Sequence, residues 1–110
     1  MGLDAEFFRS GGESVELRNH WDFQTLLFDA NATIGGPDSG VIPVTGALLD
    51  ELAALIDAGG AVVASEIPEG FLDDEPEEDW EDVAPFYLAL IARLRADLDE
   101  ARFMAYASDC

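Results

Sequence analysis

The sequence predicts a small α+β domain, with about three helices packed on a small sheet that includes strands from both ends of the chain. Three observations lead to this class. First, 110 residues suffice for one domain with a modest core. Second, apolar residues recur at helical spacing in three segments. Third, short segments near both chain ends favour extended backbone. The expected order is β-α-α-(β)-α-β, with the terminal strands paired and the helices on one face.

The first strand is expected at residues 3–8 (LDAEFF), because Phe7 and Phe8 favour β structure. After a turn, Ser14 is expected to cap a helix over about residues 15–29, with Glu16 facing the positive helix end. The apolar side of this helix is formed by residues at helical spacing: Phe23, Leu26, Leu27 and Ala30, widened by Leu17, Trp21 and Phe28.

Residues 31–43 are rich in glycine, asparagine, aspartate and proline, which predicts a loop. Thr45 is expected to cap a second helix over about residues 46–58, which the glycine pair at 59–60 ends. The following segment, residues 61–67 (AVVASEI), suits either a strand or an extended connector.

The third helix is predicted by a continuous apolar stripe from Val83 to Ala101. Pro85 would break a helix interior, but it fits the first turn if Asp82 is the N-cap. Residues 102–108 (RFMAYAS) alternate in the manner of a strand and are expected to close the sheet.

Charge limits the classes of partner. The chain has 24 aspartates and glutamates, five arginines and no lysine, for a formal net charge of −19. This balance excludes ordinary nucleic-acid binding, which needs basic residues, and argues against docking on anionic lipid. The high negative charge also makes copies of the chain repel one another, which favours a monomer. No apolar run approaches the roughly 18 residues that span a bilayer, and Asp4 and Glu6 stand where a signal peptide is basic. We expect a cytoplasmic protein.

The acidic charge is concentrated in residues 66–82 (EIPEGFLDDEPEEDWED), which hold ten carboxylates and no basic residue. This segment is the expected partner-binding site. Trp80 is interpreted either as an aromatic anchor of an interface or as a residue that packs the loop onto the third helix. The predicted contact residues are Asp73, Asp74, Glu75, Glu77, Glu78, Asp79, Trp80, Glu81 and Asp82.

Catalytic and metal-binding patterns are weak. His20 is the only histidine and is expected to be packed or on a helix surface, and Cys110, the only cysteine, to be an incidental thiol. Residues 35–40 (GGPDSG) lack the lysine of a phosphate loop. The acidic segment offers oxygen ligands, but Pro76 interrupts it and the glycine of a calcium loop is missing. We therefore expect no enzyme, no cofactor and no metal.

The chain also resembles a known group of sequences. The segments that carry the resemblance are MGLDAEFF, HWDFQTLLF (20–28), IPVTGALLDELAALI (42–56), EGFLDDEPEEDWEDV and FMAYAS. They resemble small, largely uncharacterised phage and prophage proteins that begin Met-Gly-Leu-Asp and carry a tryptophan-centred first helix. Trp21 matches the tryptophan, whereas Thr25, Asp22 and Phe23 replace polar or basic positions. The resemblance implies a phage or mobile-element setting and no particular activity.

Two functional interpretations follow from these observations. In the first, the protein inhibits a basic, nucleic-acid-binding host defence protein, as a DNA mimic of the anti-CRISPR or anti-restriction type. In the second, it is an acidic accessory protein of a halophile or a high-GC bacterium, and its charge serves solvation. A mimic should gather carboxylates on one face, because a DNA duplex presents a charge about every 1.7 Å. A solvated surface should spread them over all faces.

Overall fold

The computed structural model describes residues 2–12, 15–37, 40–57, 63–74 and 78–109. Within these residues, three helices and a four-stranded antiparallel sheet of order β2-β1-β4-β3 are formed. The α+β class, the three helices and the pairing of the two terminal strands are confirmed. The elements are β1 (Asp4–Arg9), β2 (Val15–Arg18), α1 (Trp21–Thr33), β3 (Val41–Pro43), α2 (Gly46–Ile56), α3 (Trp80–Glu100) and β4 (Met104–Asp109).

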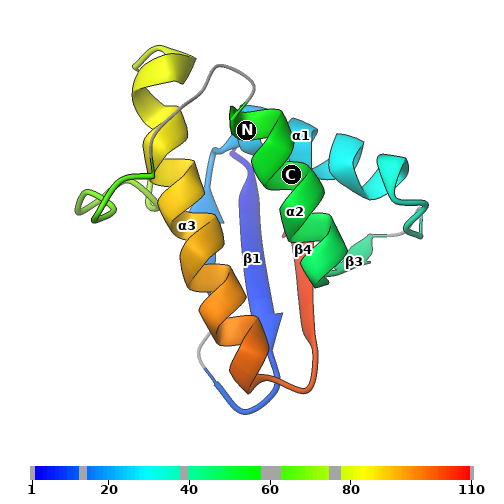
Figure 1. Ribbon diagram of the computed structural model, residues 1–110. Coiled ribbons are helices and arrows are strands. Elements are labelled where there is room, and N and C mark those ends of the chain that lie inside the picture. The colour runs from blue at the N-terminus through cyan, green and yellow to red at the C-terminus, as the bar shows by residue number, and fades with distance from the viewer. Residues whose placement is uncertain (1, 13–14, 38–39, 58–62, 75–77, 110) are drawn as a thin grey trace.

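The two central strands carry the core face of the sheet. Phe7 of β1 lies directly opposite Tyr106 of β4, with the ring centroids 4.8 Å apart. Phe23 of α1 meets Phe7 edge to face at 6.3 Å, and α2 and α3 contribute buried leucines to the same core. In Figure 1, α2 and α3 run alongside the central strands, and α1 lies next to α2. The helices thus cover one face and leave the other face open.

The expected start of the first helix at residue 15 is wrong, because Val15–Arg18 forms strand β2. Val15 and Leu17 are buried and the residues between and after them are exposed, which is the period of two of a half-buried strand. Asn19 then adopts φ 61°, and its backbone and side chain both bond to Leu3, at 2.7 and 2.8 Å. This left-handed residue ends the strand before α1. Ser14, the expected cap, lies outside the described residues.

Helix α1 begins at Trp21 and continues four residues beyond its expected end, so the predicted loop over 31–43 is shorter than expected. The end of that loop also forms an unpredicted strand, β3, in which Ile42 lies opposite Tyr106 and is buried. Three residues are too short a segment to show a strand period, so the sequence carried no signal for β3.

Helix α2 starts as predicted, since the Thr45 hydroxyl accepts a hydrogen bond from the Leu48 N–H at 3.2 Å. It ends at Ile56, and the glycine pair expected to end it lies outside the described residues. No strand is found in the part of the 61–67 segment that the structure describes, residues 63–67. There the Ala64 N–H donates to the Pro85 carbonyl at 3.1 Å, and the backbone bends at residues 65–66.

Helix α3 begins at Trp80 with Asp79 as its N-cap, three residues before the expected cap Asp82. Pro85 therefore lies inside the helix, in its second turn, and the Glu81 carbonyl has no N–H four residues ahead. The stacking of Trp80 on Tyr87 accounts for the early start, because it packs the first residue of the additional turn against the core. The closing strand is confirmed as Met104–Asp109.

Candidate functional site

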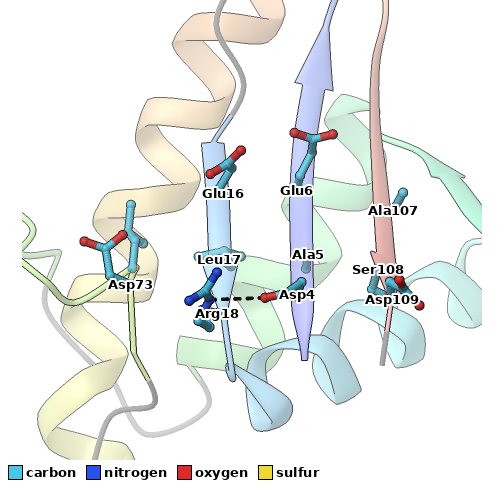
Figure 2. A pocket seen from close by; sticks show the side chains of 11 residues that line it. Asp4, Ala5, Glu6, Glu16, Leu17, Arg18, Asp73, Ala107, Ser108 and Asp109 are labelled. Carbon is cyan, nitrogen blue, oxygen red and sulfur yellow. Dashed lines mark hydrogen bonds and ion pairs between the residues drawn. The ribbon is translucent and has the colours of Figure 1, made fainter. Parts of the chain in front are cut away.

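The open face of the sheet is hollowed over β2, β1 and β4 (Figure 2). The hollow measures about 560 Å³. Five of its lining residues carry a carboxylate and one carries a guanidinium. These charged residues are Asp4, Glu6, Glu16, Arg18, Asp73 and Asp109. We call this surface the open acidic face.

The strand register places these charges in two rows across the sheet. In one row, Asp4 lies opposite Arg18 on one side and opposite Asp109 on the other. The Arg18 Nε lies 3.2 Å from an Asp4 carboxylate oxygen. Both side chains are well exposed, so this ion pair contributes only about 0–1 kcal/mol.

The second row places two negative charges against each other. Glu6 of β1 lies directly opposite Glu16 of β2, and Figure 2 shows both carboxylates on the open acidic face. Like charges in this position destabilise an antiparallel pair, whereas opposite charges stabilise it by about 0.2–1 kcal/mol. This row therefore concentrates negative charge on the open acidic face.

The loop before α3 closes one edge of the open acidic face. The Arg18 N–H donates to the Leu72 carbonyl at 3.0 Å, which ties residues 71–73 to the outer edge of β2. Gly70 has φ 84° and is the third residue of a turn that the Phe71 N–H closes by donating to the Pro68 carbonyl at 3.1 Å. A turn of this kind needs the left-handed conformation that glycine adopts at little cost. The turn brings Asp73 beside the strand carboxylates.

The predicted contact residues do not lie on one surface. Asp73 lines the open acidic face, whereas Glu78 and Trp80 line a separate small hollow with Asn19, His20 and Trp21. The rest of the described set is exposed: Asp74 in the turn, Asp79 at the N-cap, and Glu81 and Asp82 in the first turn of α3. Glu75 and Glu77 lie outside the described residues.

Trp80 is part of the packing between the loop and α3. Its ring is stacked on Tyr87 with centroids 5.3 Å apart and an interplanar angle of 24°. Phe71 meets the other side of this cluster, 5.1 Å from Tyr87 and 5.4 Å from Phe86. Of the two interpretations given to Trp80, this geometry favours packing of the loop onto the helix, and the residue also lines the small hollow.

His20 is packed, with 3% of its surface exposed. Its Nδ1 lies 2.8 Å from the Tyr87 hydroxyl, and its ring is 5.3 Å from that of Phe71. The histidine thus joins the strand end, the loop and α3. A second buried polar contact joins α1 to the sheet, where the Tyr106 hydroxyl donates to Gln24 Oε1 at 2.6 Å. Burial raises the pKa of Tyr106 well above its ordinary value, and a hydrogen bond with Ser108 offsets part of this shift.

Within the described residues, no three or more His, Cys, Asp or Glu side chains are arranged to hold a metal ion. In the same part of the chain, no helix combines the length and apolar character needed to cross a membrane.

The strand carboxylates of the open acidic face were not predicted from the sequence. Their signal was present in the alternation of Val15, Glu16, Leu17 and Arg18, which places the two charged residues on one side of a strand. A helix over this segment would place Glu16 and Arg18 on different sides, so the helix prediction gave no indication of the charge cluster.

Comparison with known proteins adds no relative, since the chain matches no family model, no curated protein and no solved structure.

Proposed function

We propose that this chain is a non-enzymatic binding protein whose open acidic face occupies a basic surface of another protein. The observation that carries this proposal is the placement of Glu6 opposite Glu16. A pair of like charges destabilises the free sheet, and departures of this kind from local rules are expected at functional sites. A basic partner surface would convert the repulsion between the two glutamates into attraction.

The charge of the whole molecule supports a fast encounter with such a partner. A net charge of −19 produces a negative potential that steers a cationic surface toward the protein, and salt weakens this steering. The exposed carboxylates at the start of α3, Glu81 and Asp82, add to this field without having to touch the partner.

The partner that we propose is a nucleic-acid-binding host defence protein, inhibited by occupation of its phosphate-binding surface. A surface that binds phosphates carries arginine and lysine at close spacing, and a compact carboxylate surface can compete for it. The phage or mobile-element setting is suggested by the resemblance of the opening residues and the tryptophan helix. We place this interaction in the cytoplasm of the host.

A second candidate function is that of an acidic accessory protein whose charge serves solvation. Exposed carboxylates on the helices as well as on the sheet favour this alternative, for example Asp22, Asp50 and Asp99. In the first candidate function, binding depends on the positions of the carboxylates. In the second, solvation depends only on their number.

The deciding experiment compares two variants with equal loss of charge. The face variant carries Glu6→Gln, Glu16→Gln and Asp73→Asn. The control variant carries Asp57→Asn, Glu69→Gln and Asp99→Asn, all exposed and away from the open acidic face. Each immobilised protein is incubated with the heparin-binding fraction of a bacterial lysate at about 0.15 M salt, the physiological range.

We expect one basic protein to be retained by the wild type and the control variant, lost with the face variant, and released by added duplex DNA. If both variants retain the same proteins as the wild type, or lose them equally, position does not matter and the proposal is wrong. The acidic surface would then be assigned to solvation.

A further inference from the structure

Helix α1 carries two large aromatic side chains that the core covers only in part, although the Phe28 ring meets the Tyr106 ring edge to face at 6.5 Å. Trp21 is 41% exposed and Phe28 is 44% exposed, whereas Phe23 and Leu27 on the inner side are fully buried. The two exposed residues are seven apart, which places them on the same side of the helix about 10.5 Å apart along its axis. Aromatic residues are enriched in protein–protein interfaces relative to the rest of the surface.

An acidic row runs beside the aromatic row. Asp22 and Asp29 are exposed, and each directly follows one of the two aromatic residues. Residues 21–33 contain no lysine or arginine. Between the two aromatics, the Thr25 hydroxyl is hydrogen-bonded to the Trp21 carbonyl at 3.0 Å. The helix therefore presents a repeat of two parallel rows, one aromatic and one negative.

The aromatic row ends at a small hollow between the starts of α1 and α3. Its lining includes Trp21, Asp22, Glu78 and Trp80, and its volume is about 40 Å³. This is room for one ammonium-sized group, since a water molecule occupies about 30 Å³ in the liquid. Two indoles and two carboxylates around such a space favour a cation, through both cation–π attraction and ion pairing.

We propose that the outward side of α1 is a docking surface for a basic amphipathic helix of a partner protein. Apolar residues of that helix would pack on Trp21 and Phe28, and lysines or arginines would lie along Asp22 and Asp29. One lysine would end in the hollow beside Trp80. This docking of a helix on α1 follows the usual mode of helix recognition, in which apolar anchors set the affinity and flanking charges set the register.

Charge decides against other occupants. A second copy of this chain would bring the same acidic row and a further net charge of −19 to the contact. Nucleic acid and anionic lipid are repelled for the same reason. Because α1 lies in the helix layer and the open acidic face is on the other side of the sheet, this inference does not depend on the proposed function.

The test uses the full chain and a synthetic peptide. The peptide has about 14 residues, roughly four helical turns, with leucine and lysine in helical order (LKKLLKLLKKLLKL). A scrambled peptide of the same composition serves as its control. Affinity is measured by calorimetry over a series of salt concentrations, and the contact is mapped by amide chemical shifts. We expect tighter binding of the ordered peptide, with shifts centred on α1.

The variant Trp21→Ala/Phe28→Ala is expected to weaken binding at least tenfold, roughly the effect of removing two aromatic anchors. Its control is Phe103→Ala, which removes an aromatic that is 53% exposed just before β4. Asp22→Asn/Asp29→Asn is expected to weaken binding and to reduce its salt dependence, compared with Asp57→Asn/Asp99→Asn. Circular dichroism checks that each variant is folded.

Three results would each overturn the proposal. The first is binding by the double aromatic variant within about twofold of the wild type, which is too small a change for an anchor. The second is equal binding of the scrambled peptide, which would reveal attraction by charge alone. The third is a wild-type dimer in sedimentation that the double aromatic variant loses, which would make a second copy the occupant. None of these results depends on Glu6, Glu16 or Asp73.

Discussion

Removing one charge from the Glu6–Glu16 pair should stabilise the fold, although it deletes a charged surface residue. Side chains directly opposite have Cβ atoms about 5 Å apart, which puts the two carboxylates on the order of 6 Å from each other. At that separation the repulsion is about 0.7 kcal/mol in water. Screening at about 0.15 M salt reduces it to roughly 0.3 kcal/mol. We therefore expect Glu16→Gln to increase the free energy of unfolding by about 0.3–0.7 kcal/mol, and more at low salt.

The assay is urea unfolding at several salt concentrations, with a double-mutant cycle over Glu6→Gln, Glu16→Gln and both together. The cycle isolates the interaction between the two residues from the general benefit of lowering the net charge. Glu69→Gln removes the same charge from an exposed loop and serves as the control. The melting temperature should rise by about 1–3 °C. A coupling energy of zero, or one that favours the pair, would refute the reasoning.

Two further predictions concern buried polar contacts. Burial raises the pKa of Tyr106 above the ordinary value of 10.0, so the unfolded chain loses this proton first as pH rises, and stability should be complete below about pH 10 and fall above it. In Tyr106→Phe, the free energy of unfolding followed against pH should lack the part of the alkaline decline that this hydroxyl causes. An unchanged decline would contradict the role given to Tyr106. Asn19→Ala should lower the free energy of unfolding by about 1–3 kcal/mol, because alanine disfavours φ 61° and the side-chain bond to Leu3 is lost. Asn19→Gly, which tolerates this φ, should lower it less when both variants are unfolded chemically. The reverse order would show that backbone conformation is not the cause.

The parts of the fold that were predicted correctly are those with long, regular patterns. Helix α3 has an apolar stripe over several turns, and α2 has both a stripe and a cap in Thr45. The errors occurred where a pattern was too short to specify its period. Val15–Arg18 contains two apolar residues, which fit one side of a helix start as well as one side of a strand. Its pairing with β1 decided the outcome, and local sequence does not encode that pairing.

The candidate site was predicted in character and only partly in position. The excess of carboxylates was evident from the sequence, and Asp73 does line the open acidic face. However, Glu6, Glu16 and Asp109 come together with it only through the strand register, which joins residues more than 90 positions apart. Composition shows how much charge a chain carries, and topology shows where that charge is concentrated.

The strand order also constrains the sequence of events in folding. Strand β4 follows the other three strands of the sheet along the chain, yet it lies between β1 and β3 and bonds to both. During synthesis, β1 and β3 therefore have no strand between them until β4 has emerged. Until then, the backbone groups of β1 and β3 that bond to β4 have no partner strand. Contacts between the two ends of a chain close slowly, because a long loop must be ordered first. The sheet, and with it the open acidic face, is completed by β4, which follows the other three strands along the chain.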